Sequence, residues 1–330
     1  MPVRRSAVVT VVTALVVLLA GEAAARAVAG RLPDRLEWGS REAQVKLHQL
    51  GRARHVDVLL VGNSMVDVGI DPVRLAAALP GRPTAYNAAV SGMPTRSVDH
   101  WLEAALLPTV HPKLLVIGVS MRDLNDNGRQ EAVFDASLTR SLGYRRATGS
   151  MSWRQQLDSS ASRASRLVGL RDYWRDPGDA LRCVRGKSVR QWSFALHPGG
   201  QKPPKDEAFA TSDVRRREIR EQAFNDFHVG GVDTAALRSA VRAGQRSGAT
   251  VVILSMPLDR ADLVPLLPRG DADADAFDRE VRAVGAQTGV RVLEPQADFP
   301  GTTWFHDEYH LNIGGSARLT DWLAAHLPAG

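Results

Sequence analysis

The sequence predicts an α/β protein in which a five-stranded parallel sheet carries helices on both faces, preceded by an apolar segment at the N-terminus. Short apolar runs alternate with amphipathic segments along much of the chain, which is the pattern of a parallel sheet with crossover helices. One of these runs, KLLVIGVS at 113–120, is almost entirely apolar, as expected for a strand buried on both faces. The 330 residues, 44 % of them apolar, can bury the core that such a sheet needs.

The N-terminal segment, 1–30, is predicted to be a membrane anchor. Arg4 and Arg5 precede a nearly unbroken apolar run at 7–20, and extension to residue 29 gives the ~20 residues that a membrane span needs. A cleaved secretory signal is the alternative, because a basic start, an apolar stretch and an Ala-x-Ala sequence at 27–29 fit that pattern too. Both interpretations export the rest of the chain, and residues 31–54 then form a polar juxtamembrane segment.

The elements of the sheet follow in order from residue 55. HVDVLLVG at 55–62 is the first predicted strand, and the next helix, 71–79, starts with Asp71 as N-cap and Pro72 at its first position. The remaining predicted strands lie at 84–90, 113–120, 250–257 and 290–295, and the remaining predicted helices at about 97–107, 233–248, 277–286 and 316–327. The folded domain is accordingly predicted to span 55–330.

The alternation stops between about 125 and 232, and this segment is predicted to be a helical insertion in the domain. It is rich in Arg, contains Trp153, Trp174 and Trp192, and includes a Gly- and Pro-rich stretch at 197–207 that is predicted to be flexible. A segment of this length between strands commonly forms a lid or a partner surface. The alternative is a solvent-exposed helical segment with neither of these roles.

The charge and the cysteine content exclude several classes of function. The net charge of +6 comes from scattered Arg, and no basic stretch interleaved with aromatic residues indicates a nucleic-acid partner. A mildly cationic surface suits acidic polymers and anionic lipid headgroups alike. Cys183 is the only cysteine, which excludes an intrachain disulfide and a cysteine-based metal site.

No metal ion or cofactor is expected from the other polar residues. His100, His111 and His228 have no ligand-like neighbours in the sequence. The acidic run DADADAFD at 271–278 lacks the spacing of a calcium-binding loop. It is instead predicted to begin a helix, because the helix dipole favours negative charge at that end.

Chemistry-bearing residues follow the predicted strands where each strand ends. Ser64 comes after the first strand, Gly92 after the second and Arg122 after the third, while Asp307 and His310 follow the last. Ligands of doubly wound sheets bind outside the carboxyl ends of the strands, so these residues are expected to lie together. The sequence therefore predicts a single site built from segments that are far apart in the chain.

Ser64, His310 and Asp307 are interpreted as a nucleophile, its general base and the carboxylate that orients the base. A serine hydroxyl is a weak nucleophile near neutral pH and needs an adjacent base, a role that suits imidazole. Asp307 comes one turn before His310 and can reach its Nδ1. The backbone N–H groups of Ser64 and Gly92 are expected to stabilise the oxyanion. Taken alone, Ser64 could be an ordinary loop residue, and Ser120 is a second choice of nucleophile.

These motifs resemble those of the SGNH (GDSL-type) hydrolases, a superfamily of serine esterases and acyltransferases. Three stretches carry the resemblance: Gly62-Asn63-Ser64, residues 87–92 and residues 307–312. The likeness covers about 56–123 and 250–327. It implies a flavodoxin-like fold of three α/β/α layers, a Ser64–His310–Asp307 triad and an oxyanion glycine at Gly92.

The third block departs from the family pattern. Arg122 stands where the family has an asparagine that donates to the oxyanion, and Asn63 replaces the aspartate of the first block. The resemblance implies that Gly92, Arg122 and Asn63 face the substrate. Arg122 could donate to the oxyanion, bind an anionic substrate group or pair with Asp123.

The apolar N-terminus, the altered third block and the long insertion together resemble exported SGNH proteins of cell-envelope assembly, such as the D-alanine transfer protein of teichoic acid synthesis and the alginate O-acetylation proteins. That resemblance implies a membrane-attached enzyme outside the cytoplasm. It would act on acyl esters, chiefly acetyl, of an envelope glycan or glycopolymer, and a membrane protein could supply the acyl group. Trp304 and Tyr309 would stack on a sugar or pack around the site. The alternative from another class is a catalytically inactive SGNH-fold module that binds glycans or scaffolds an acylation complex.

Overall fold

The computed structural model describes residues 2–32, 37–53, 55–186, 196–206 and 208–328. The chain divides into two compact units, one made of 1–37 with 149–193 and the other of 38–148 with 194–330. The segment 125–232 is therefore not one piece, because its middle belongs to the first unit and its two ends to the second. Trp192 lies outside the described residues.

The second unit is built on a five-stranded sheet in which all neighbouring strands run parallel. The strands are β1 (Val58–Val61), β2 (Ala85–Asn87), β3 (Leu114–Val119), β4 (Thr250–Ser255) and β5 (Arg291–Leu293). Their order is β2-β1-β3-β4-β5, the flavodoxin-like order of doubly wound sheets. The predicted parallel sheet and its five strands are confirmed, although each strand is shorter than the apolar run that predicted it.

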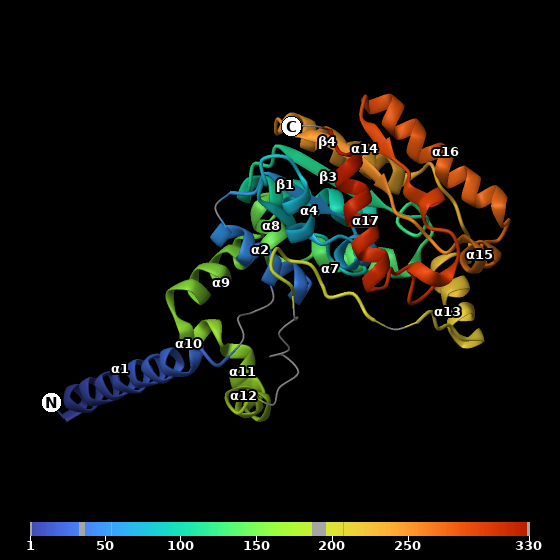
Figure 1. Ribbon diagram of the computed structural model, residues 1–330. Helices are drawn as coiled ribbons and strands as arrows, with labels where there is room; N and C mark the ends of the chain where they lie inside the picture. The colour runs from blue at the N-terminus through green and yellow to red at the C-terminus, as the bar shows by residue number, and fades with distance from the viewer. Residues whose placement is uncertain (1, 33–36, 54, 187–195, 207, 329–330) are drawn as a thin grey trace. The chain divides into compact units, whose positions relative to one another are not determined.

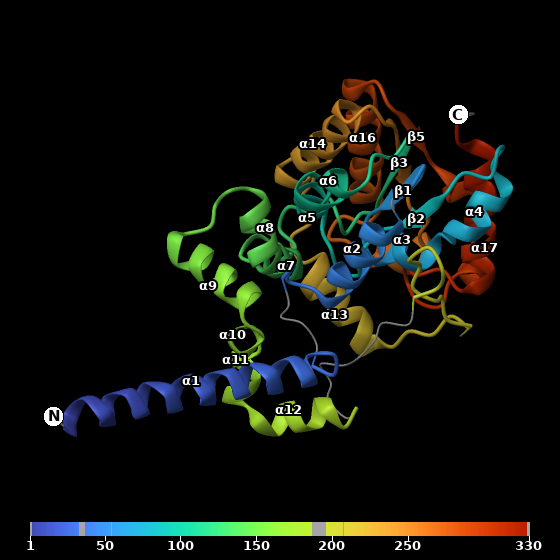
Figure 2. The same cartoon turned by 90° about the vertical axis from the view of Figure 1, so that its left-hand side faces the viewer.

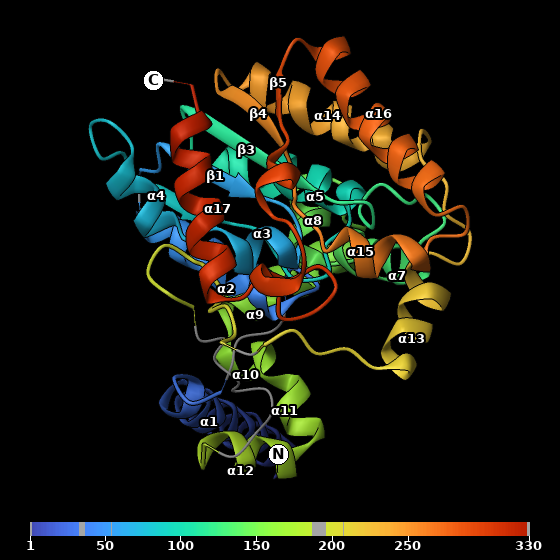
Figure 3. The same ribbon diagram turned by 45° about the vertical axis from the view of Figure 1, so that its right-hand side comes forward.

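Helices cover both faces of this sheet (Figure 1; Figure 3). A Cβ built on Gly244 would meet the side chains of Leu115 and Val251, whereas one built on Gly118 would meet Val66. Since successive side chains of a strand point to opposite faces, Leu115 and Gly118 mark the two faces of β3. One layer contains α5 (Thr95–Trp101), α14 (Val232–Arg246) and α16 (Asp271–Thr288), and the other contains α3 (Ser64–Gly69), α4 (Pro72–Ala78) and α17 (Ile313–His326). The three-layer α/β/α architecture is thus confirmed.

Several shorter elements complete the second unit. A π-helical turn, η1 (Leu102–Leu106), and α6 (Leu107–Thr109) continue α5. The others are α7 (Arg129–Thr139), α8 (Leu142–Ala147), α13 (Asp213–Ala223), α15 (Arg260–Leu263) and the 3-10 turns η3 (Val264–Leu266), η4 (Pro295–Asp298) and η5 (Thr302–Trp304).

Local signals explain where two helices begin. The Asp71 carboxylate accepts hydrogen bonds from the backbone N–H groups of Val73 and Arg74, so Asp71 caps α4 with Pro72 at the first position, as predicted. The acidic run predicted to begin a helix does so, because α16 starts at Asp271. The helix α3 was not predicted, since its six residues are too few to show a period.

The helix α2 (Arg41–Ala53) corrects the prediction of a polar juxtamembrane stretch at 31–54. Ala43 and Leu50 are fully buried in the core of the second unit, and the Lys46 side chain is fully buried as well. The Tyr86 hydroxyl of β2 donates to Gln49 Oε1 at 2.7 Å and lies 3.4 Å from the Lys46 carbonyl oxygen. These contacts join α2 to the edge of the sheet (Figure 2). The folded unit therefore begins near Trp38 and not at residue 55.

The stretch 197–207 was predicted to be flexible, but its described part, 197–206, is held by hydrogen bonds within the second unit. The backbone N–H of Asn87 donates to the Gly199 carbonyl oxygen at 2.7 Å. The Gln201 side chain, 1 % exposed, donates to the Val68 carbonyl oxygen at 2.9 Å. This stretch therefore runs beside β2 and α3 and takes part in the packing around them.

The first unit joins α1 (Pro2–Ala29) to four helices from the middle of the chain, α9 (Trp153–Ala164), α10 (Arg166–Gly169), α11 (Arg171–Arg175) and α12 (Pro177–Val184). Glu22 of α1 accepts hydrogen bonds from Ser165 Oγ at 2.7 Å and from the backbone N–H of Leu167 at 3.0 Å. Ala25 and Leu32 pack in a small core with Leu170, Tyr173 and Cys183.

The apolar part of α1, Ala7–Ala29, is long and apolar enough to cross a membrane, with a mean hydropathy of 2.2. None of its most apolar stretch is buried. These properties suit both a signal anchor and a signal peptide, the two interpretations that the sequence left open.

Candidate active site

The carboxyl ends of β1 and β3 form the base of the candidate site. In a sheet of this order, ligands bind where the connections after neighbouring strands lead to opposite faces. The exit from β1 requires glycine: Gly62 has φ +153°, and a Cβ there would lie 2.5 Å from Val66 Cγ2 and 2.7 Å from the Gly118 carbonyl oxygen. This tight exit makes Ser64 the first residue of α3.

Ser64, His310 and Asp307 form one hydrogen-bonded chain. The His310 Nε2 lies 2.8 Å from Ser64 Oγ, and the His310 Nδ1 lies 2.7 Å from Asp307 Oδ2. The side chains of His310 and Asp307 are 17 % and 20 % exposed, so these two residues are largely shielded from water but still accessible to it. With the Nδ1 proton directed at Asp307, the Nε2 lone pair faces the serine hydroxyl.

The Asp307 carboxylate is held by the loop that carries it. Its Oδ1 accepts hydrogen bonds from the backbone N–H groups of His310 at 2.7 Å and Tyr309 at 3.1 Å. Burial by itself raises the pKa of Asp307, but the hydrogen bonds from His310 and from the two amides outweigh burial and lower the pKa to about 2. Asp307 is therefore ionised wherever imidazole is neutral.

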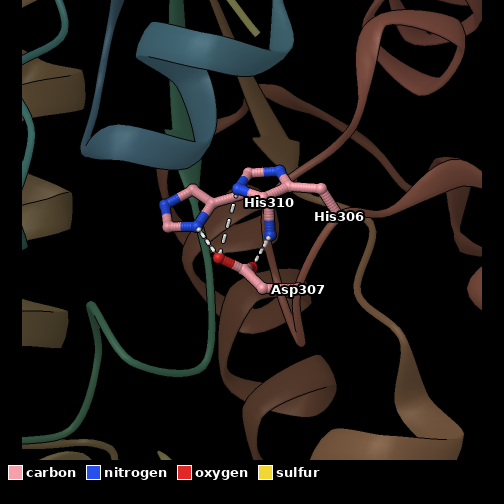
Figure 4. A group of neighbouring side chains, drawn as sticks. All are labelled: His306, Asp307 and His310. Atoms are coloured by element: carbon pink, nitrogen blue, oxygen red, sulfur yellow. Dashed lines mark hydrogen bonds and ion pairs between the residues drawn. The ribbon is translucent and has the colours of Figure 1, made fainter. Parts of the chain in front are cut away.

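A second imidazole faces the same carboxylate (Figure 4). His306 Nε2 lies 3.4 Å from Asp307 Oδ2, and its ring stacks on that of His310 with centroids 5.5 Å apart. Burial lowers the pKa of His306, so the neutral form is favoured. Ligand atoms of the three residues lie within 4.8 Å of one another, which would suit a metal ion. A metal ion there would displace the Nδ1 proton that joins His310 to Asp307. The geometry of the three residues therefore fits proton transfer better than metal binding.

Asn63 and Asp123 tie the end of β1 to the end of β3. The Asn63 Oδ1 accepts from the backbone N–H of Met65 and caps α3, while its Nδ2 donates to Asp123 Oδ1 at 2.6 Å. Asp123 Oδ2 accepts from the backbone N–H and the hydroxyl of Ser120, at 2.8 and 2.7 Å. Burial raises the pKa of Asp123 to about 7 despite these hydrogen bonds. The Ser120 hydroxyl is thus directed at Asp123, whereas the Ser64 hydroxyl is directed at His310.

A cavity of about 20 Å³ opens beside Ser64. Gly92 and Arg122, which were predicted to face the substrate, both line it, as does Asn63. Gly92 has φ +79°, in the left-handed region that favours glycine. The cavity is also lined by Met65, Pro94, Ser120, Asp123, Phe224, Leu258, Leu263 and Tyr309.

The apolar wall includes residues that the sequence did not single out. Phe224, which ends α13, is 1 % exposed and packs edge-on against Phe227 with ring centroids 6.0 Å apart. Leu263 belongs to α15. Neither lies in the motif stretches 62–64, 87–92 and 307–312, and an isolated phenylalanine at the end of an Arg-rich segment gives no signal by itself.

The two aromatic residues near the histidine have different surroundings. Tyr309 lines the cavity, its ring meets that of His310 at 4.6 Å, and its hydroxyl accepts from Arg215 at 2.6 Å. Trp304 packs edge-on against Phe299, and the Arg318 guanidinium lies 4.7 Å above its ring. Only Tyr309 therefore lies where a substrate bound beside Ser64 would touch it.

The three histidines without predicted roles lie away from this cavity wall. His100 Nδ1 lies 3.1 Å from Asp135 Oδ1, while His111 and His228 are exposed.

No known family model matches the chain, and no curated protein matches it either. Among solved structures, two variants of a Geobacillus stearothermophilus enzyme, described as an acetyl-xylooligosaccharide esterase and as an acetylxylan esterase, are similar to it at 12 % and 13 % identity, with TM-scores of 0.40 and 0.39. They cover 83 % and 81 % of this chain and 95 % and 92 % of their own. A Parabacteroides merdae protein described as GDSL-like lipase has 14 % identity and a TM-score of 0.39, covering 81 % of this chain and 94 % of its own.

At these scores the fold assignment rests on the strand order and on the layers of the sheet. Both are those that the resemblance to SGNH hydrolases predicts.

Proposed function

We propose that this chain is an SGNH-type serine esterase or O-acyltransferase that acts on acyl esters of cell-envelope glycans. The observation that carries the proposal is the contact of 2.8 Å between His310 Nε2 and Ser64 Oγ, with Asp307 behind the imidazole. Side chains 246 positions apart in the sequence meet here in the order that nucleophilic catalysis needs.

The geometry supports a two-step mechanism. His310 Nε2 takes the proton of Ser64 as its Oγ attacks the ester carbonyl carbon, and the carbonyl oxygen becomes an oxyanion. The backbone N–H groups of Ser64 and Gly92 and the Arg122 guanidinium stabilise that oxyanion. The tetrahedral intermediate collapses to an acyl-serine as His310 gives its proton to the leaving alcohol. Water or a sugar hydroxyl, deprotonated by His310, then takes the acyl group and restores Ser64.

The size of the cavity supports a short acyl group, acetyl in the first place. About 20 Å³ admits only one or two water-sized groups beside the nucleophile. Met65, Phe224, Leu258 and Leu263 give this space an apolar wall that suits a methyl group. The glycan part of the substrate would lie outside, over Tyr309 and Arg122.

Replacing Phe224 with alanine is expected to shift the preference toward longer acyl chains. Removal of the ring extends the cavity, so kcat/KM for an aryl hexanoate should rise at least about ten-fold relative to that for the acetate. The measurement is the ratio of kcat/KM over a series of aryl esters from acetate to octanoate. Phe227→Ala is the matched control, since Phe227 packs on Phe224 but is not part of the cavity wall, and its ratio should stay that of the wild type. An unchanged ratio in Phe224→Ala would exclude Phe224 as the wall of the acyl site.

The anchor interpretation of α1 has support in the first unit. Cleavage after residue 29 would remove Glu22 and Ala25, which bind Ser165 and Leu167 and pack with Leu170. A helix whose loss would expose such a core is better suited to stay attached. We therefore propose a single-pass membrane protein whose enzyme unit lies outside the cytoplasm, near glycans and near a membrane protein that could supply the acyl group.

A catalytically inactive SGNH-fold module that binds glycans or scaffolds an acylation complex is the second candidate. The Asn63 amide donates to Asp123 and caps α3, and Arg122 replaces the expected asparagine, so the donors around the oxyanion differ from the family pattern.

An assay of the full chain in detergent tests the proposed activity. Given 4-nitrophenyl acetate, the protein is expected to release nitrophenol and acetate, and added neutral and acidic oligosaccharides should divert acetyl groups from free acetate to sugar ester if it is a transferase. Free acetate alone across all acceptors would identify an esterase. Absence of both products in the wild-type protein would contradict the enzyme proposal and favour the inactive module.

A further inference from the structure

Five polar side chains contact one another where α2 meets α3 and the loop after β2. Figure 2 shows α2 and α3 close together. We call Glu42, Lys46, Asp67, Ser91 and Lys202 the Lys46 cluster. The Lys46 and Asp67 residues are fully buried and Glu42 is 3 % exposed. Ser91 lies in the motif stretch 87–92, whereas the four charged residues were not singled out in the sequence, because isolated charged residues give no pattern.

Lys46 is the centre of the cluster. Its Nζ lies 2.5 Å from Asp67 Oδ1, donates to the Ala89 carbonyl oxygen and lies 3.6 Å from Glu42 Oε1. The three contacts come from α3, from the loop after β2 and from α2 itself. One ammonium group therefore joins three segments of the second unit.

Ser91 and Lys202 extend these links. The Ser91 hydroxyl donates to Asp67 Oδ2 at 3.1 Å and accepts from Lys202 Nζ at 3.2 Å, while the backbone N–H of Ser91 donates to Glu42 Oε2 at 3.3 Å. Burial and the Asp67 carboxylate raise the pKa of Glu42 to about 8, so Glu42 carries a proton near neutral pH. The backbone on either side of residue 90 is thus fixed, by Lys46 at the Ala89 oxygen and by Glu42 at the Ser91 nitrogen.

The cluster joins the two segments that carry the nucleophile and the oxyanion glycine. Asp67 lies one turn after Ser64 on α3, and Ser91 immediately precedes Gly92. A buried ion pair is weak evidence for stability, since apolar side chains of similar size often stabilise a protein as well or better. What directional contacts add is a fixed geometry, and a misplacement of about 1 Å in an active site can lower a rate by about a hundred-fold.

We propose that the Lys46 cluster fixes the distance between Ser64 and the Gly92 amide, and that Lys46 and Ser91 are positioning residues for the oxyanion hole. The inference rests on the proposed function, because it assigns the Gly92 amide to an oxyanion. Lys46 and Ser91 act through the segments they hold and touch no reacting atom.

Ser91→Ala is the main test in the full chain, because it removes the hydroxyl that joins Asp67 to Lys202 with little loss of volume. We expect kcat for an aryl acetate to fall about ten-fold with KM within about two-fold, and the affinity for phenylboronic acid, which forms a tetrahedral adduct on serine, to fall by the same factor as kcat. Hydrogen exchange in the peptide that contains residues 88–94 should become faster. Ser91→Thr, which keeps the hydroxyl, should restore all three.

Asp57→Asn is the matched control. Asp57 also accepts hydrogen bonds from a threonine and pairs with Lys113, but it precedes β1 and lies at the opposite end of the strands. Asp57→Asn should leave kcat and the rate of hydrogen exchange at 88–94 unchanged. Lys46→Met is expected to lower kcat and speed exchange as Ser91→Ala does, but more strongly. Because a buried Asp67 without its partner can prevent folding, the comparison of Ser91→Ala with Ser91→Thr is the decisive test of the proposal.

The outcomes separate the cluster from the proposed function. Unchanged exchange at 88–94 in Ser91→Ala would show that the cluster does not hold the loop. Faster exchange with unchanged kcat and boronate affinity would show that the loop is held but that the Gly92 amide serves no oxyanion. Either result overturns the inference and leaves the chemistry of Ser64 intact. A wild-type protein with neither turnover nor boronate binding would refute the proposed function and the oxyanion hole together, while exchange would still report on the loop.

Discussion

Replacing Ser64 with alanine should lower the turnover of an aryl acetate by on the order of 10³-fold or more, because no other group in the proposed mechanism can carry the acyl group. The loss should fall on kcat, since the cavity beside residue 64 keeps its other walls. Steady-state kinetics of the full chain in detergent, with circular dichroism to show that the variant is folded, is the measurement.

Ser120→Ala is the control for this prediction. Ser120 lines the same cavity, but its hydroxyl donates to Asp123 at 2.7 Å and not to His310. Turnover should therefore stay within about ten-fold of the wild type. The reverse pattern, with Ser120→Ala inactive and Ser64→Ala active, would make Ser120 the nucleophile and refute the proposed mechanism.

Asp307→Asn should lower kcat by about 10³- to 10⁴-fold, the second-largest effect expected. The Asn amide group can donate to His310 Nδ1, which favours the tautomer whose Nε2 carries a proton, and that tautomer cannot accept the Ser64 proton. An oxygen remains to accept the backbone N–H groups of Tyr309 and His310, so the loop should persist. His306→Gln removes the neighbouring imidazole and keeps the carboxylate, so its activity should stay within about ten-fold of the wild type.

Asp307→Asn should also change how the stability of the fold depends on pH. The pKa of Asp307 is lowered from 3.8 to about 2 in the folded chain, so its ionisation stabilises the fold above pH ~4 by about 2 kcal/mol, and this is lost as the pH falls toward 2. Asp307→Asn should therefore have a lower Tm than the wild type at pH 6, and the gap should close as the pH falls to 2. A gap independent of pH would contradict the assigned ionisation.

The sheet and the position of Ser64 at its edge could be predicted because their signals are local. Apolar runs of strand length mark β1, β3 and β4, and Gly62 before Ser64 marks a tight exit from a strand. The partnership of Ser64 with His310 needed one further rule, that the carboxyl ends of parallel strands meet at one edge. The observed contact of 2.8 Å is the geometry that this rule anticipates.

The features that could not be predicted from the sequence depend on contacts between distant segments. The helix α2 reads as polar because Glu42 and Lys46 lie on it, yet both are buried by pairing with Asp67 and Ser91. Phe224 reaches the cavity only through the packing of α13.

The division of the segment 125–232 was also not predicted. It depends on where α9 to α12 pack, and the residues of α1 in the small core with them, Ala25 and Val28, read in the sequence as the end of a membrane span.

The most direct test of the central claim, that His310 activates the Ser64 hydroxyl, is to locate the site of a fluorophosphonate adduct by peptide mass spectrometry. The full chain should acquire one adduct, on the peptide that contains Ser64, and Asp307→Asn should acquire it far more slowly. An adduct on Ser120 or elsewhere, or equal labelling of the wild type and Ser64→Ala, would contradict the claim.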